Sequence, residues 1–286
     1  MEKAKQIKII TDTASDITLD LAEKYNIHLI PINLNINGKE YKDKYDIKTE
    51  EFYIELKNCS ELPKTSQITV SQHYDIFKKY IDYSIIYCPI SSKASGSASA
   101  AHIAKTTIEE EITDADITII DCETFSYCYG LWVIEAAKMV IDGASKNMII
   151  SMLNEKLSKT EAMFAVDDLK YLKKGGRISS AENIVANVLD IKPILTINDG
   201  LVVSYDKVRG TKKLYTKLVD ILKKNALEDF GQSIVIYHSD SPDKAEKLKE
   251  MIIENTNFKN FVIVEIGPTI GIHTGPGALA LSYIKK

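Results

Sequence analysis

The sequence lacks the features that mark membrane proteins and nucleic-acid-binding proteins. No apolar run approaches the ~20 residues that span a bilayer, and the first residues contain no apolar signal region. The net charge of −4 at pH 7 gives no general attraction for nucleic acid or an anionic membrane, because both need clustered Lys and Arg. We therefore predict a cytoplasmic protein that binds no nucleic acid, and we leave transient contact with a membrane open.

Cysteine and histidine are also scarce. The chain has four cysteines and five histidines, with no C-x-x-C pair and no histidine at metal-ligand spacing from a cysteine. We interpret the cysteines as reduced and mostly buried rather than as metal-binding or redox residues. They are Cys59, Cys88, Cys122 and Cys128. We expect no metal and no cofactor.

The first half of the chain shows the alternation that is typical of a parallel sheet with helices on both faces. Short β-branched runs occur at residues 7–10, 85–90 and 117–121. Helical periodicity occurs at residues 19–25, 71–80, 98–110 and 131–141. Because ligands of such sheets bind beyond the carboxyl ends of the strands, the loops there are the candidate sites.

The second half has a different pattern, which follows a helix predicted at residues 145–159. Apolar runs at 192–197 and 201–205 flank Asn-Asp-Gly, which predicts a hairpin. A strand at 234–238, a helix at 243–254 and a strand at 261–266 complete a second α/β unit. The sequence therefore predicts two apposed α/β domains: residues 1–155 with a mainly parallel sheet, residues 156–286 with a mixed sheet, and the ligand between them.

Two segments near strand ends carry hydroxyl side chains whose function the sequence alone does not decide. T-D-T-A-S-D at residues 11–16 is equally typical of an N-cap cluster for the helix from Leu19 and of a place near the ligand. P-K-T-S-Q at residues 63–67 is, alone, more typical of a turn.

Two further segments favour ligand contact. In residues 90–100, six of eleven residues are Ser or Gly, which allows close backbone approach and offers several O–H donors to one anion. Residues 267–279, G-P-T-I-G-I-H-T-G-P-G-A-L, are interpreted as a rigid glycine-rich loop around His273. The other histidines lack this setting, so we rank His273 first.

Phosphate binding and catalysis both lack their usual motifs. Residues 271–277 have the glycines of a phosphate-binding loop without the lysine, and no strand ends in G-x-G-x-x-G. No G-x-S-x-G elbow is present, although a serine acyl hydrolase using the loop from Ser91 to Ser99 and His273 remains the alternative. Redundant neutral donors suit the binding of a carboxylate better than catalysis, which needs one nucleophile.

Together, these segments resemble the DegV family, the bacterial fatty-acid-binding proteins. Residues 11–16 are similar to its T-D-S-T-S-D opening, residues 65–67 to T-S-Q, and residues 90–97 to I-S-S-x-L-S-G-T. Residues 174–178 are similar to K-G-G-R-I, and residues 271–277 to G-x-H-x-G-P-G. The matches follow the order of the family over nearly the whole chain.

The resemblance implies a two-domain α/β protein that encloses one long-chain fatty acid with its tail in an apolar tunnel. It implies that Thr65, Ser95 and His273 bind the carboxylate, with Ser92 and Gly96 as neighbours. It also implies that the protein is not an enzyme, because a separate ATP-dependent fatty acid kinase makes the acyl phosphate for phospholipid synthesis. A sensor that binds the ligand without any kinase is a third hypothesis.

Some positions depart from the family pattern or have an open role. Ala94 and Ser97 replace the commoner Leu and Thr, which leaves the width of the tunnel and the preferred chain open. Arg177 and Arg209 are candidates for a surface that faces the kinase or a phosphate. For Arg209, a local cap or ion pair is an equal alternative.

Overall fold

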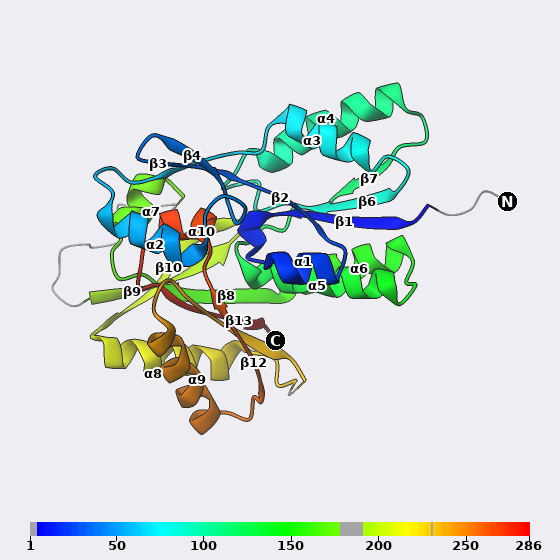
Figure 1. Ribbon diagram of the computed structural model, residues 1–286. Coiled ribbons are helices and arrows are strands. Elements are labelled where there is room, and N and C mark those ends of the chain that lie inside the picture. Colours follow the sequence, from blue (N-terminus) through cyan, green and yellow to red (C-terminus); the bar gives the residue numbers. More distant parts are fainter. Residues whose placement is uncertain (1–4, 178–190, 230) are drawn as a thin grey trace.

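The computed structural model describes residues 5–177, 191–229 and 231–286, and its sheets and helices alternate in layers (Figure 1). Helices α3 and α4 cover one face of a parallel sheet. Helices α1, α5 and α6 lie between this sheet and a second, mixed sheet, whose far face is covered by α8 and α9. Helix α5 packs against both β1 and β8 and so joins the two sheets.

Local sequence signals explain where several helices begin. Thr69 caps α3 together with Gln72 in a capping box, and Pro242 and Pro268 stand in the first turns of α9 and α10. The helices of the first half are η1 (Thr13–Ser15), α1 (Leu19–Lys24), α2 (Thr49–Asn58), α3 (Val70–Lys79), α4 (Ser97–Glu111), α5 (Tyr127–Ile141) and α6 (Lys146–Lys159). Those of the second half are α7 (Lys170–Gly175), α8 (Thr211–Asn225), α9 (Pro242–Asn255) and α10 (Pro268–Thr274).

The first half contains the predicted parallel sheet, with strand order β2-β1-β6-β7. Its central strands are buried on both faces, as their continuous apolar runs require. The strands are β1 (Ile7–Asp12), β2 (His28–Ile30), β6 (Ser84–Cys88) and β7 (Asp116–Ile119). A small antiparallel sheet that we did not predict accompanies it: β3 (Asn33–Ile36), β4 (Lys39–Lys42) and β5 (Lys64–Ser66).

The second half contains the predicted mixed sheet, with strand order β10-β9-β8-β13-β11-β12. Only β11 and β12 pair in parallel among the described strands of this sheet. The predicted hairpin turn is confirmed, since Asp199 and Gly200 both have positive φ between β9 and β10. The strands are β8 (Thr160–Ala165), β9 (Ile191–Asn198), β10 (Leu201–Arg209), β11 (Ser233–His238), β12 (Asn260–Glu265) and β13 (Leu279–Ile284).

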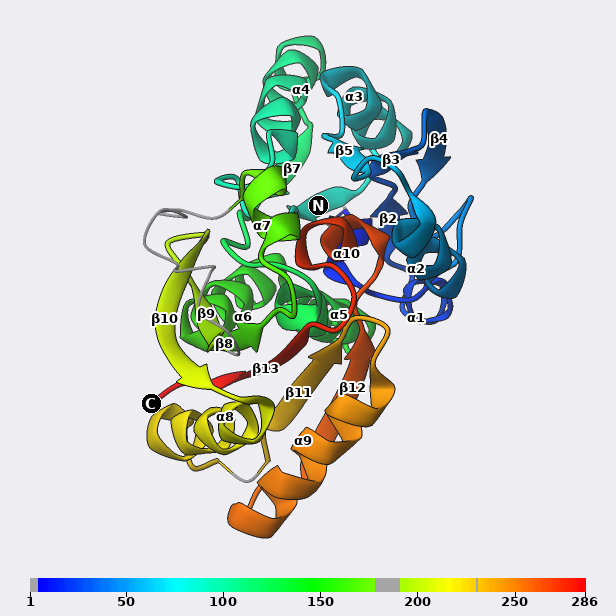
Figure 2. The ribbon, with the colours of Figure 1, turned by 90° about the vertical axis from the view of Figure 1, so that its left-hand side faces the viewer.

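The glycine-rich segment at residues 267–279 differs from the predicted loop. Its first half forms the short helix α10, which ends at Gly275 with a φ of 69°. A left-handed residue is the usual way to end a helix, and glycine adopts it without strain. Figure 2 shows α10 between α2 and α7, and it contacts both of these helices as well as β5. The helix therefore joins elements of both halves.

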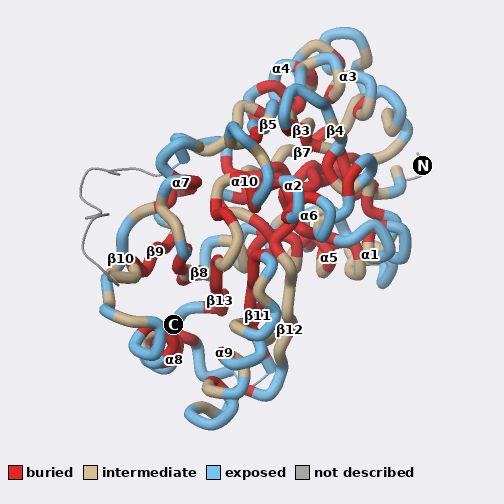
Figure 3. Tube along the Cα trace, turned by 60° about the vertical axis from the view of Figure 1, so that its left-hand side comes forward, coloured by how far each residue is buried: buried red, intermediate tan, exposed pale blue. Residues whose placement is uncertain are grey.

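The buried core continues from one sheet to the other (Figure 3). Its largest cluster extends from Ile9 in β1 to Ala280 in β13, whereas a second cluster lies between the mixed sheet and helices α8 and α9. The fold class is as predicted. The proposed boundary near residue 155 falls inside α6 and stays a prediction.

Candidate ligand-binding site

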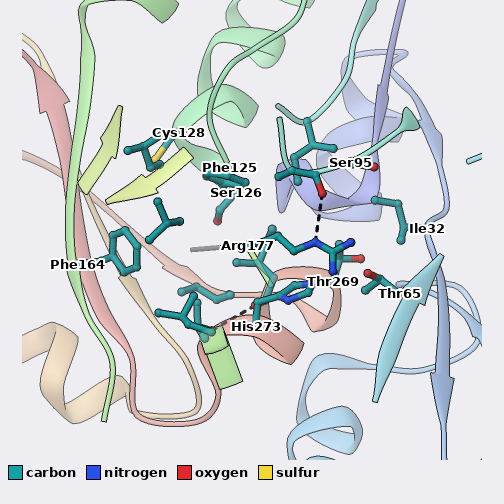
Figure 4. Close-up of a pocket in the computed structure, with 18 of the residues that line it drawn as sticks. Ile32, Thr65, Ser95, Phe125, Ser126, Cys128, Phe164, Arg177, Thr269 and His273 are labelled. Atoms are coloured by element: carbon teal, nitrogen blue, oxygen red, sulfur yellow. Dashed lines mark hydrogen bonds between the residues drawn. The ribbon is translucent and has the colours of Figure 1, made fainter. Parts of the chain in front are cut away.

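A cavity of about 300 Å³ lies between the two sheets, and elements of both halves line it (Figure 4). The first half contributes β5, the loop before α4 and the start of α5. The second half contributes α7, β8, β9, β10, β11, α10 and β13. Cavities that hold small organic ligands commonly measure roughly 300–1,000 Å³, so this one is large enough for a ligand.

Four of the five predicted carboxylate-site residues line this cavity. Thr65 lies in β5, Ser95 and Gly96 lie in the loop before α4, and His273 lies in α10. These three segments are far apart in sequence and meet because α10 packs against β5. The structure therefore brings the motifs together around one space.

The backbone of Gly96 lies close to the side chain of Gln67, which belongs to a neighbouring motif. A Cβ atom at this position would collide with the amide group of Gln67, which also lines the cavity. The clash involves only the end of the exposed Gln67 side chain, so a side chain at position 96 would displace this amide from the cavity lining.

His273 is neutral and has an unused nitrogen. Burial, together with the charge of Arg177, lowers the pKa of the imidazole to about 4. Its Nδ1 atom is buried and has no hydrogen-bond partner among the described residues. A Cβ atom at Gly175 would collide with this nitrogen, so the glycine allows α7 to pack against the ring. A buried nitrogen without a partner is costly. This one is covered by Gly175 of α7 and is not open to the cavity.

The two arginines differ in placement. Arg177 lines the cavity, where its Nε donates to the carbonyl of Ala94 at 3.3 Å and its guanidinium also donates to the carbonyl of Gly175. The polar lining therefore includes a cation, which the sequence analysis, with its neutral donors, did not expect. Arg209 lies at the exposed end of β10, away from the cavity, and makes no side-chain hydrogen bond or ion pair with the described residues.

Ser92 does not belong to the cavity lining. The residue is exposed, and its backbone N–H donates to Asp121 Oδ1 at 3.1 Å. This bond fixes the loop without using the serine hydroxyl. We therefore leave Ser92 out of the site proposed below.

Apolar side chains line the rest of the cavity, and the sequence analysis identified none of them. Phe125 precedes α5, Phe164 lies in β8, Leu172 in α7, Ile197 in β9 and Val202 in β10. They come from five segments without a shared motif. No local sequence signal marks them, because each looks like an ordinary apolar residue of its segment.

Two buried aspartates support the walls of the cavity from behind. Asp16 accepts a hydrogen bond from Ser126, which lines the cavity, and another from the backbone N–H of Gly267 at 3.0 Å. Asp43 accepts a hydrogen bond from Thr269 of α10, which also lines the cavity. Burial raises the pKa of Asp16 to about 6 and raises that of Asp43. We did not predict Ser126 or Thr269 from the sequence.

The T-D-T-A-S-D segment does not cap the helix that starts at Leu19, and its two acids lie behind the cavity lining. Asp12 caps the short helix η1 and accepts a hydrogen bond from the backbone N–H of Ile90 at 2.9 Å, at the start of the serine-rich loop. Thr18, rather than this segment, caps α1. Neither Asp12 nor Asp16 lines the cavity, so the acids hold in place the loops that line it.

The described residues contain no cluster of three or more His, Cys, Asp or Glu side chains that could hold a metal ion. None of their helices has both the length and the apolar character needed to cross a bilayer. Cys88, Cys122 and Cys128 are buried and Cys59 is half-buried, as expected, and all four are free.

Two sheets, helices between and outside them, and a ligand-sized cavity lined by both halves define an α/β protein built around an internal site. A sequence model described as "Uncharacterised protein, DegV family" matches residues 6–286. The chain belongs to the DegV family, which confirms the resemblance inferred from its motifs.

Relatives match the chain over nearly its whole length. A DegV domain-containing protein of Clostridium perfringens is 35% identical over 98% of this chain and 99% of its own. The structure of a protein of Streptococcus agalactiae, described as a fatty acid binding DegV family protein, is 29% identical and covers 99% of this chain and 100% of that one, with a TM-score of 0.87. DegV of Bacillus subtilis, described as a fatty acid binding protein, is 28% identical with the same coverage and a TM-score of 0.85.

Proposed function

We propose that this protein binds one long-chain fatty acid in the cavity between its sheets, with the carboxylate at Thr65, Ser95 and His273. The observation that carries the proposal is that polar residues of three motif segments and apolar side chains line one cavity, with Thr65 and Ser95 on one side of it and Phe125 and Phe164 on the other (Figure 4). Relatives of 28% and 29% identity described as fatty acid binding proteins support it. Arg177 adds a charge that favours an anionic head group.

The apolar wall would supply most of the affinity. Burying a methylene group is worth about 0.8 kcal/mol, so a chain of about sixteen carbons offers on the order of 10 kcal/mol before ordering costs. Each hydrogen bond to the carboxylate adds only about 1 kcal/mol net, because water competes for the same group. The head group is therefore free to change chemically while the tail holds the ligand.

We extend the proposal to a carrier role, in which a separate ATP-dependent fatty acid kinase phosphorylates the bound carboxylate for phospholipid synthesis. This step is supported by the family resemblance of the motifs. The protein itself would provide no catalysis. Incubating the loaded protein with ATP and a candidate kinase, and trapping acyl phosphate with hydroxylamine, tests this step separately from binding.

Ligand binding is tested on protein purified from cells. Native mass spectrometry followed by organic extraction should show one fatty acid per chain, and delipidated protein should take up palmitate or oleate. If neither a co-purified fatty acid nor uptake is found, the proposed function is wrong. A protein that binds fatty acid but supports no phosphorylation with any kinase would be a sensor.

The serine acyl hydrolase stays the alternative function. Among the described residues, no serine hydroxyl and no carboxylate forms a hydrogen bond with His273, so the geometry of an activated nucleophile is not present. Steady release of acid from a p-nitrophenyl acyl ester, abolished by Ser95→Ala, would favour the hydrolase over the carrier.

Substitutions of the polar residues separate binding from presentation to the kinase. Thr65→Ala, Ser95→Ala and His273→Ala should each weaken palmitate binding by about three- to tenfold, which is the effect of one lost hydrogen bond. Acyl phosphate formation should fall further, because the free head group loses its position. Equal losses in both measurements would contradict the carrier role.

A further inference from the structure

Ser97 lies directly behind the proposed carboxylate site without lining the cavity. Its side chain is fully buried at the start of α4, and its Oγ lies 2.9 Å from Ser95 Oγ. Its backbone N–H also donates to Ser95 Oγ at 3.2 Å. On its other side, Ser97 Oγ accepts a hydrogen bond from the backbone N–H of Ile68 at 3.1 Å. The hydroxyl of Ser97 thus connects the segment after β5 to Ser95.

The directions of two of these bonds are fixed, because a backbone N–H can only donate. A serine hydroxyl has one proton and two lone pairs. Ile68 therefore occupies one lone pair of Ser97 Oγ, and the N–H of Ser97 occupies one lone pair of Ser95 Oγ. The bond between the two hydroxyls can run in either direction.

We propose that Ser97 is a positioning residue that directs the proton of Ser95 toward an anionic ligand; this inference rests on the proposed function. A carboxylate only accepts hydrogen bonds, so a bound carboxylate requires Ser95 to donate into the cavity. Ser97 must then donate to Ser95. The result is a chain of donors from Ile68 N–H through Ser97 and Ser95 to the ligand, in which each bond polarises the next.

The chain of donors makes Ser97 a determinant of ligand class. A fatty alcohol both donates and accepts, so it bonds to Ser95 whichever way the hydroxyl pair runs. An ionised fatty acid bonds well only when Ser97 donates. Losing the Ser97 hydroxyl should therefore weaken the binding of an acid more than the binding of an alcohol of the same length.

The test uses dodecanoate and 1-dodecanol as probes at pH 8, each displacing a fluorescent fatty acid from the delipidated full chain. Ser97→Thr and Ser97→Val have the same shape and differ in the hydroxyl, so they form a matched pair. Ser97→Val should bind dodecanoate about three- to tenfold more weakly than Ser97→Thr and bind dodecanol within about twofold of it. Ser97→Thr should keep the ratio of the two affinities of the wild type.

Folding controls distinguish Ser97 variants that fail to fold from variants that fold but position Ser95 poorly. Ser97→Val leaves the buried N–H of Ile68 without its acceptor, so circular dichroism and a melting curve accompany each binding measurement. Ser97→Ala removes the same hydroxyl without adding a methyl group, and it replaces the valine variant if that one does not fold. In a Ser95→Ala background, removing the Ser97 hydroxyl should change dodecanoate affinity by less than about twofold, because Ser97 acts through Ser95.

The outcomes separate this inference from the function on which it rests. An equal loss of acid and alcohol binding, or a loss that persists in the Ser95→Ala background, would overturn the positioning role. A wild-type protein that binds dodecanol but not dodecanoate or palmitate would overturn the proposed carboxylate site itself. A selective and Ser95-dependent loss of acid binding supports both.

Discussion

The two ends of the cavity are built in different ways. The polar end is formed by short motif segments, in which Thr65, Ser95 and His273 meet through close contacts at glycines. The apolar end is formed by single residues of separate strands and helices, such as Phe164 and Ile197, which share no motif. The difference indicates that ligand affinity depends on the exact position of each side chain at the polar end, whereas it depends on the total apolar volume at the other end. Substitutions should therefore act by different rules at the two ends.

The largest effect is expected from filling the apolar end. Ala162 in β8 is buried and lines the cavity, so Ala162→Phe would place a ring in a space of about 300 Å³. Excluding three or four methylene groups of the tail would cost about 3 kcal/mol, so palmitate affinity should fall at least about 100-fold. Isothermal titration of palmitate into the delipidated variant measures this loss.

The matched control is Ile103→Phe on the exposed side of α4, which should leave palmitate affinity unchanged. Melting temperatures of both variants show whether the added ring disturbs folding. If folded Ala162→Phe binds palmitate as the wild type does, the tail does not occupy the described cavity.

The same difference explains what the sequence could predict. The polar end was found because Ser95, Gly96 and His273 stand in unusual local patterns after strands. Phe125 and Leu172 could not be found, since an apolar residue looks the same whether it faces a core or a cavity. Arg177 was predicted to be a functional residue, but it was assigned to an outer surface rather than to the cavity. Its orientation depends on the packing of α7, which the sequence does not show.

For the fold as well, features with a clear local sequence pattern were predicted, and features that depend on tertiary packing were not. Short β-branched runs that alternate with helical periodicity predicted the parallel sheet, and Asn-Asp-Gly between two apolar runs predicted the hairpin. We did not predict four short elements from the sequence: the strands β3, β4 and β5 and the helix α10. Tertiary packing stabilises them more than their local sequence pattern does. The hydrogen bonds of Ser126 to Asp16 and of Thr269 to Asp43 could not be predicted, because each joins residues more than 100 positions apart in the sequence.

The second prediction concerns the titration of the polar end. An unfolded histidine has a pKa of 6.5, whereas burial lowers the pKa of His273 to about 4 in the folded protein. Between these values the unfolded chain binds more protons, so the free energy of unfolding falls as the pH falls. The loss from this residue is on the order of 3 kcal/mol between pH 6.5 and pH 4. Urea unfolding of the delipidated protein measures it.

The matched variant for this titration is His273→Gln, which should show a smaller loss over the same range. Subtracting the two pH curves is necessary because Asp12 and Asp16 act with the opposite sign. Their folded pKa of about 6 exceeds the unfolded 3.8, so they stabilise the protein as the pH falls through 6. Parallel curves for the wild type and His273→Gln would mean that His273 is not buried as a neutral group.

The third prediction tests how strictly position matters at the polar end. Gly175→Ala adds one methyl group where a Cβ atom would collide with His273 Nδ1. The imidazole must move, so palmitate affinity should fall by about tenfold, which is the upper end of the effect of one lost hydrogen bond. Lys174→Ala, one residue earlier and exposed, should leave the affinity unchanged. A wild-type affinity in Gly175→Ala would show that the position of the ring is not critical.

The smallest effect is expected at Ser92, which the motif includes and the cavity does not. Its hydroxyl is exposed, and the bond that fixes the loop comes from its backbone N–H to Asp121. Ser92→Ala keeps that N–H, so palmitate affinity should stay within about twofold of the wild type. Ser95→Ala in the same loop is the matched comparison, because it removes a hydroxyl that lines the cavity. If Ser92→Ala loses as much affinity as Ser95→Ala, the carboxylate lies farther along the loop than the cavity indicates, and the polar end extends beyond its described lining.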